Sequence, residues 1–135
     1  MIFVDSSVWI DYLRDLETSQ TEILDSILGK KRVVVGDLVI VEVLQGCNDP
    51  KTFSETVQLF KRSDFIIVGG YQVAVEAARN YVTLRAKGIT IRKTIDTLIA
   101  TRCILNGFDL LHNDRDFLPF EKHLGLKSVI PTTDH

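Results

Sequence analysis

Ile2-Phe3-Val4-Asp5-Ser6-Ser7-Val8-Trp9-Ile10, close to the start of the chain, is the stretch that decides the fold. Three consecutive apolar residues predict a strand over residues 2–4 that is buried on both faces, and an acid follows directly where that strand ends. Ser6 or Ser7 can then cap a short helix whose apolar face carries Trp9. A buried strand that runs straight into a helix indicates an α/β protein.

The same alternation of apolar strands and amphipathic helices continues along the chain. Further strands are predicted at 33–35, 65–68 and 108–111, with a short fifth strand at 129–130. Helices are predicted in the intervals, at 18–28, 37–45, 50–61, 71–87 and 94–106. The helix at 50–61 is expected to turn Phe53, Val57 and Phe60 inward. Apolar strands separated by helices predict a three-layer α/β/α sandwich with a central parallel sheet of four to five strands.

Bulk properties narrow the class of protein. A chain of 135 residues with 45% hydrophobic content is expected to form a single domain, 1–135. Cys47 and Cys103 lack metal or redox spacing and are expected to be reduced core thiols. No apolar run approaches the ~20 residues of a membrane span, and the N-terminus lacks a basic leader, so we expect a cytoplasmic protein without membrane association. A net charge of −2 does not by itself indicate nucleic-acid binding.

Four carboxylates stand against apolar sequence: Asp5, Glu42, Asp96 and Asp114. Desolvating a lone carboxylate costs several kcal/mol, so acids in such positions need a partner. Ligands of parallel α/β sheets bind beyond the carboxyl ends of the strands, and Asp5 and Asp114 both follow such ends. If the four acids converge, their repulsion requires a cation. Oxygen ligands without Cys or His favour Mg²⁺, with Mn²⁺ as the expected substitute.

Each acid also has a structural interpretation. Asp5 could cap the first helix, Asp96 lies where a helix dipole favours acids, and Asp114 with Asp116 could cap a helix near residue 117. Glu42 is harder to explain in this way, because apolar residues surround it and no Lys or Arg stands three or four positions away. The four together favour a shared site over four separate structural roles.

Such a site could hydrolyse a phosphodiester without a protein nucleophile. Divalent metal ions lower the pKa of bound water and stabilise the leaving oxygen, with one or two ions in the site. No G-x-S-x-G elbow is present, and His112 is expected only to fill space beside its strand. Basic residues precede the third acid and form either a phosphate-gripping rim or a solvated loop: Arg85, Lys87, Arg92 and Lys93.

Four ordered motifs resemble those of PIN-domain proteins. They are Ile2-Phe3-Val4-Asp5-Ser6-Ser7-Val8-Trp9-Ile10, Leu38-Val39-Ile40-Val41-Glu42-Val43-Leu44-Gln45-Gly46, Thr94-Ile95-Asp96-Thr97-Leu98-Ile99-Ala100 and Leu111-His112-Asn113-Asp114-Arg115-Asp116-Phe117. Their order and spacing, and the chain length, also agree with the family. The chain is similar in particular to the VapC ribonuclease toxins of bacterial VapBC toxin–antitoxin pairs.

The resemblance implies a Mg²⁺-dependent endoribonuclease that cleaves structured RNA such as tRNA. It also implies a homodimer and a cognate VapB-type antitoxin whose tail covers the active site. The family's catalytic and metal-binding acids correspond to Asp5, Glu42, Asp96 and Asp114, with Asp116 as a supporting metal ligand. Substrate-binding candidates are Ser6 and the four basic residues above. The role of Asp37, just ahead of the second motif, stays open.

Two other functions are consistent with parts of the sequence. One is a non-catalytic PIN-like module for RNA binding or assembly, although a dead domain has no need to keep a repulsive acidic cluster. The other is a phosphoaspartate phosphatase, which requires a second Asp two positions after the first, where this chain has Ser7. Trp9 and Tyr12 are candidates either for partner or dimer contacts or for the core.

Overall fold

The computed structural model describes residues 1–30 and 32–132, and within them four strands form one parallel sheet. The sheet order is β3-β2-β1-β4. The strands are β1 (Ile2–Val4), β2 (Val33–Gly36), β3 (Asp64–Ile66) and β4 (Asp109–Leu111). The central strand β1 pairs with both neighbours, so that Ile2 lies opposite Val33 on one side and Asp109 on the other. The predicted parallel α/β/α architecture is confirmed.

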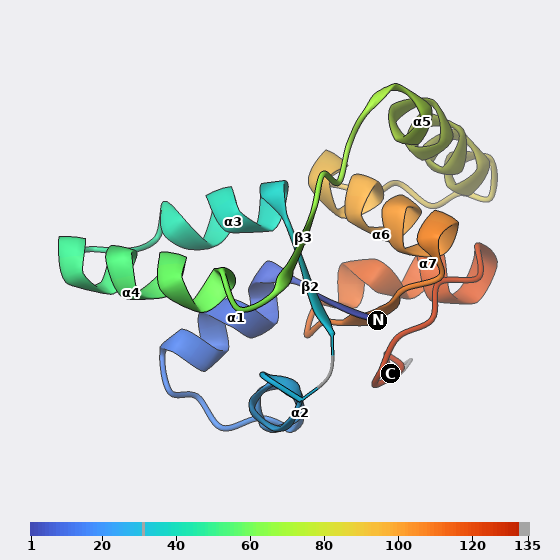
Figure 1. Cartoon of the computed structure of the whole chain (residues 1–135). Helices are drawn as coiled ribbons and strands as arrows, with labels where there is room; N and C mark the ends of the chain where they lie inside the picture. Colours follow the sequence, from blue (N-terminus) through green and yellow to red (C-terminus); the bar gives the residue numbers. More distant parts are fainter. Residues whose placement is uncertain (31, 133–135) are drawn as a thin grey trace.

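Helices cover both faces of the sheet (Figure 1). On one side, α1 contacts α2 and α3, and α3 contacts α4; on the other side, α5 packs on α6, and α6 lies against β4. Their bounds are α1 Ser6–Leu13, α2 Ser19–Ile27, α3 Asp37–Leu44, α4 Pro50–Phe60, α5 Tyr71–Ala86, α6 Thr94–Asn106 and α7 Leu118–His123, with a short 3-10 turn, η1, at Arg115–Phe117. Within the described ranges, no helix has both the length and the apolar character needed to cross a membrane.

Two predicted strands differ from the observed ones. The segment expected to form a fifth strand makes only an isolated parallel bridge, between Ser128 and Leu110. The third strand ends at Ile66 instead of residue 68, because the N–H of Val68 donates to the side chain of Asp37 at 2.8 Å rather than to a neighbouring strand. This bond gives Asp37 a structural role, which is to hold the chain as it leaves the sheet.

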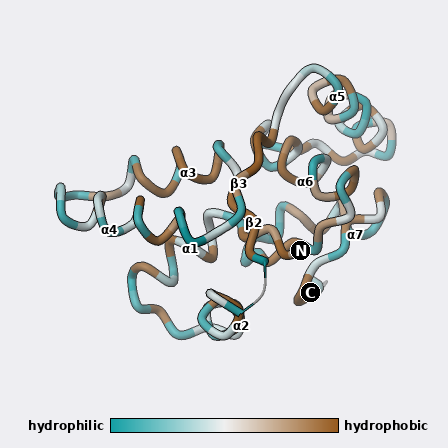
Figure 2. The backbone as a smooth tube through the Cα atoms, in the orientation of Figure 1, coloured by the Kyte–Doolittle hydropathy of each residue, from teal (hydrophilic) through white to brown (hydrophobic). Residues whose placement is uncertain are grey.

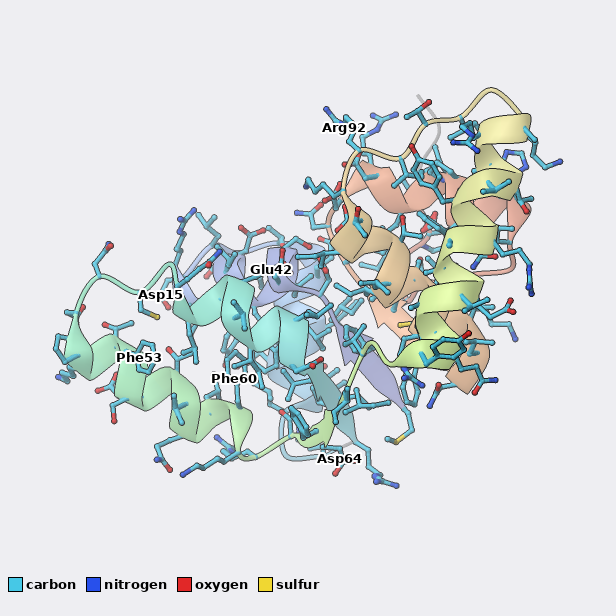
Figure 3. The ribbon with its side chains drawn as sticks, turned by 90° about the horizontal axis from the view of Figure 1, so that it is seen from above. Asp15, Glu42, Phe53, Phe60, Asp64 and Arg92 are labelled. Carbon is cyan, nitrogen blue, oxygen red and sulfur yellow. The ribbon has the colours of Figure 1, made fainter. Side chains whose placement is uncertain are left out.

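The core is apolar and continuous with the strands, which form the hydrophobic centre of the molecule in Figure 2. Trp9 is fully buried and meets Phe60 edge-on, with ring centroids 5.0 Å apart, so it belongs to the core. Phe53 was expected to face inward but is 45% exposed. It lies near the outer end of α4, beyond the reach of the core (Figure 3). Cys103 is a buried free thiol of the core, as predicted, whereas Cys47 is also a free thiol but is only half-buried and lies outside the core cluster.

Gly36, at the junction of β2 and α3, lies in close contact with the core. A Cβ at this position would overlap the Val68 side chain and lie 2.9 Å from the Phe3 ring. A Cβ at Gly69 would meet nothing within 4 Å in the described part of the chain. Only a glycine therefore lets α3 start this close to the sheet.

We expect Gly36→Ala to lower the free energy of unfolding by about 1–3 kcal/mol, because overpacking forces the surrounding core to shift. Gly69→Ala is the matched control and should change it by less than about 0.5 kcal/mol. Urea denaturation of both variants measures the difference. Equal losses in the two variants would contradict the close packing at Gly36.

Candidate metal centre

Two of the predicted acids, Asp5 and Asp114, lie at the edge of the sheet where the parallel strands end. Asp5 directly follows β1 and caps α1, in place of Ser6 or Ser7, by accepting the N–H of Ser7 at 3.1 Å. Asp114 follows β4 and caps η1. Because β1 and β4 are neighbouring parallel strands, with Val4 opposite Leu111, the two acids emerge side by side.

Helices bring the remaining acids to the same place. Asp96 lies in the first turn of α6, and one oxygen each of Asp96, Asp114 and Asp116 lies within 4.8 Å of the others. Asp5 acts electrostatically on Asp96 and also on Glu42, which projects from the middle of α3. The structure therefore places Asp96, Asp114 and Asp116 together, and the charge of Asp5 links Asp5 and Glu42 to them. We call these five acids the acidic cluster.

Burial raises the pKa of three acids of this cluster, Asp5, Glu42 and Asp96, and so opposes their ionisation. Burial, followed by the charge of Asp5, raises the pKa of Asp96 to about 7, although the ammonium of Lys93 opposes the shift. Burial and then Asp5 likewise raise the pKa of Glu42. Burial raises the pKa of Asp5 even though Ser7 donates hydrogen bonds to its carboxylate. Negative charge at this site is held at a cost in the absence of a cation.

Two serines hold the acids in place. The Ser7 hydroxyl donates to Asp5 Oδ2 at 2.7 Å and accepts the backbone N–H of Asn113 at 3.1 Å. It therefore connects Asp5 to the loop that carries Asp114. The Ser6 hydroxyl bonds to Glu42 and lowers its pKa. Sequence reasoning missed Ser7; its only local signal is a hydroxyl two positions after a capping Asp. For Ser6, substrate binding stays a prediction.

The oxygens of the acidic cluster fit a hard divalent cation. Among the described residues, Glu42 Oε1 and Asp96 Oδ2 are buried without a hydrogen-bond partner. Unsatisfied buried carboxylate oxygens are costly, and a metal ion is the ligand that would satisfy several at once. The Lys93 Nζ lies 3.4 Å from Asp114 and 4.0 Å from Asp96, so one positive charge is shared among acids that outnumber it. An all-oxygen ligand set suits Mg²⁺ or Mn²⁺.

The basic candidates separate into two pairs. Arg92 donates to both oxygens of Asp116 at 3.1 and 3.3 Å, and it lies with Lys93 in the loop that leads into α6 (Figure 3). Arg85, in contrast, lies over the ring of Tyr81, and Lys87 caps the end of α5. Neither of this second pair forms an ion pair with the acids in the part of the chain that the structure describes. Of the four basic candidates, Arg92 and Lys93 are thus the two that lie beside the acidic cluster.

His112 does more than fill space. It is buried, and its Nδ1 accepts the backbone N–H of Asp114 at 3.2 Å. Its other ring nitrogen lies 3.0 Å from Glu121. A histidine in an apolar strand gives no sequence signal for such contacts, since Glu121 is recognisable as its partner only once the fold is known.

Comparison with known proteins agrees with the fold. A family model for the PIN domain matches residues 2–122. Ribonuclease VapC11 of Mycobacterium tuberculosis is 28% identical over 119 residues, which cover 87% of this chain and 89% of that protein. The structure of VapBC2 from Rickettsia felis, bound to a promoter DNA fragment, aligns with a TM-score of 0.75 at 17% identity, over 95% of this chain and 97% of that one. The structure of M. tuberculosis VapC20, described as a Sarcin-Ricin loop cleaving toxin, aligns with a TM-score of 0.65 at 17% identity, over 97% of this chain and 100% of that one.

We expect Asp96→Asn to stabilise the metal-free protein at high pH. The pKa of Asp96 is raised from 3.8 to about 7, so the folded state binds the proton more tightly, and the stability this gives is lost as pH rises from about 4 to about 7. The variant lacks this loss, so its free energy of unfolding should exceed that of the wild type by about 1–2 kcal/mol at pH 8. The two free energies of unfolding should be similar at pH 4. Denaturation in EDTA at both pH values measures the gap. Asp109→Asn, at the exposed start of β4, is the control, and an equal gain there would refute the electrostatic cause.

We expect Ser7→Ala to weaken divalent-ion binding by about tenfold, because outer-shell hydrogen bonds that orient ligands typically contribute 10–100-fold. The variant loses both the donor to Asp5 and the acceptor for Asn113. Calorimetric titration with Mn²⁺ measures the effect, and Ser26→Ala, which removes an exposed hydroxyl from α2, is the control. An unchanged affinity in Ser7→Ala would mean that Ser7 does not support the acidic cluster.

Proposed function

This chain belongs to the PIN domain family, and on that basis we propose that it is a metal-dependent endoribonuclease that hydrolyses phosphodiester bonds in RNA. The observation that carries the proposal is the acidic cluster, in which oxygens of Asp96, Asp114 and Asp116 lie within 4.8 Å of one another and the charge of Asp5 acts on Asp96 and Glu42. Two buried oxygens of this cluster, Glu42 Oε1 and Asp96 Oδ2, have no hydrogen-bond partner among the described residues. A repulsive arrangement of this kind is useful to a protein that binds a divalent ion and has no evident structural benefit.

Asp5, Glu42, Asp96 and Asp114 would hold Mg²⁺, or Mn²⁺ in its place, with Asp116 in support. A bound ion supplies activated water and neutralises charge on the phosphate. The chain's own contribution is to fix these ligands: Asp5 through Ser7, and Glu42 through Ser6. Arg92 and Lys93 form ion pairs with acids of this cluster and carry the positive charge that an RNA backbone requires. Arg85 and Lys87 would extend this contact along the strand of RNA.

We infer further that the protein is the toxin of a type II toxin–antitoxin pair. The support is that its relatives include a protein named ribonuclease VapC11, and that VapBC complexes share its fold. A cognate VapB-type antitoxin would then be the protein partner, and the active form would be a homodimer. The proposed substrate is a structured RNA such as tRNA.

Incubation of the purified protein with total RNA, with Mg²⁺ or with EDTA, tests the proposal. We expect discrete cuts only with Mg²⁺ and a loss of at least about 100-fold in rate for Asp5→Asn or Asp96→Asn, since charge stabilisation by the ion contributes several kcal/mol. Both variants should remain folded, because removing one charge relieves repulsion. Mapping the cut ends identifies the RNA class.

Asp109→Asn serves again as the charge-matched control and should cleave like the wild type. Cleavage that persists in EDTA would contradict metal dependence. Full cleavage by Asp96→Asn would point to a contaminating nuclease. RNA binding without cleavage in any protein, wild type included, would favour the alternative of a non-catalytic RNA-binding or assembly module.

A further inference from the structure

A buried histidine lies directly beneath the loop that carries the fourth and fifth acids. His112, at the end of β4, is 4% exposed, and its ring packs against Phe117 with centroids 4.8 Å apart. Its Nδ1 accepts the backbone N–H of Asp114 at 3.2 Å. An imidazole nitrogen that accepts a hydrogen bond carries no proton, so the ring proton of neutral His112 is on Nε2.

The Nε2 nitrogen lies close to a charged acceptor, Glu121, and also 3.1 Å from the Ser128 hydroxyl. Glu121 Oε1 lies 3.0 Å from Nε2 and also accepts the hydroxyls of Ser128 at 2.6 Å and Thr132 at 2.9 Å. The N–H of Thr132 donates to the other oxygen of Glu121 at 3.2 Å. Burial raises the pKa of Glu121, but these hydrogen bonds outweigh burial and hold its pKa below the usual value. Glu121 is therefore a fixed carboxylate that selects one tautomer and one orientation of the histidine ring.

The orientation of the His112 ring affects the carboxylate oxygens of Asp114, because the ring holds the backbone N–H of that residue. Asp114 Oδ1 accepts the N–H of Asp116 at 2.9 Å, which turns Oδ2 toward Lys93, 3.4 Å away within the acidic cluster. On the preceding residue, Ser7 accepts the N–H of Asn113. Two successive amides of this loop are thus held, one from α1 and one from His112.

We propose that His112 is a positioning residue that holds Asp114 in its ligand geometry, and that Glu121, anchored by Ser128 and Thr132, holds His112. The inference rests on the proposed metal site. It assigns to α7 and to residues 128–132, which contain none of the acids of the cluster, a part in shaping it.

Two substitutions separate positioning from packing. In His112→Asn, the amide oxygen takes the place of Nδ1 and can still accept the N–H of Asp114. In His112→Gln, the amide nitrogen can reach the place of Nε2 and bond to Glu121, and more of the side-chain volume is kept, but the acceptor for Asp114 is lost. Positioning therefore predicts that Gln is the more damaging change, whereas a packing role predicts that Asn is.

The first measurement is Mn²⁺ affinity by calorimetric titration. We expect His112→Gln to bind about 10–100-fold more weakly than the wild type, and His112→Asn, which keeps the acceptor for Asp114 but loses the contact to Glu121, to show a clearly smaller loss. His123→Gln, an exposed histidine on α7, is the control and should be unchanged. Thermal unfolding of each variant verifies that it is folded. Equal affinities for the Gln variant and the wild type, or equal losses in Gln and Asn, would overturn the proposal.

The second measurement needs no metal. In the metal-free protein, hydrogen exchange of the Asp114 amide should be at least about tenfold faster in His112→Gln than in the wild type, and the increase in His112→Asn should be clearly smaller. An Asp114 amide that stays protected in His112→Gln would overturn the proposal. A wild-type protein that binds no Mn²⁺ would instead refute the metal chemistry proposed above, and the exchange data would still decide the role of His112.

Discussion

The main constraint on this structure is the acidic cluster, because gathering negative charge at one edge of a small sheet costs free energy. Asp5 and Asp96 are almost completely buried, and each raises the free energy of ionising the other. Ser7 and Lys93 offset part of this cost, through hydrogen bonds and through an ammonium shared among three acids. The part of this electrostatic cost that Ser7 and Lys93 do not offset would add to the free energy that a divalent ion gains on binding. The divalent ion that we propose would relieve this repulsion.

The fold supplies this arrangement at low additional cost. Parallel pairing of β1 with β4 places Asp5 and the loop that carries Asp114 at adjacent strand ends. The absence of a side chain at Gly36 lets α3 begin close against the core, and this sets the position of Glu42. Backbone pairing and core packing therefore do most of the positioning, and short-range hydrogen bonds refine it.

The sequence predicts the parts of the molecule whose signal is local. Asp5, Glu42, Asp96 and Asp114 could be found because charge in apolar runs is conspicuous, and the strands because three or four apolar residues in a row need burial on both faces. Phe53 was misplaced because helical periodicity gives its face on α4 but not how far the core extends beneath that helix. Ser7 and His112 were missed because their partners are far away in sequence, as with Ser7 and Asn113. Such contacts follow from topology rather than from pattern.

The support of Glu121 by Ser128 and Thr132 affects how shortened forms of this protein should be interpreted. Cutting the chain ahead of Ser128 would remove the two hydroxyls that donate to Glu121. The His112 ring would then lose its fixed orientation, and the loop after β4 would become less ordered. Such a fragment could lose its function with every carboxylate of the site intact. An inactive truncated form is therefore no proof that the tail touches RNA or a partner.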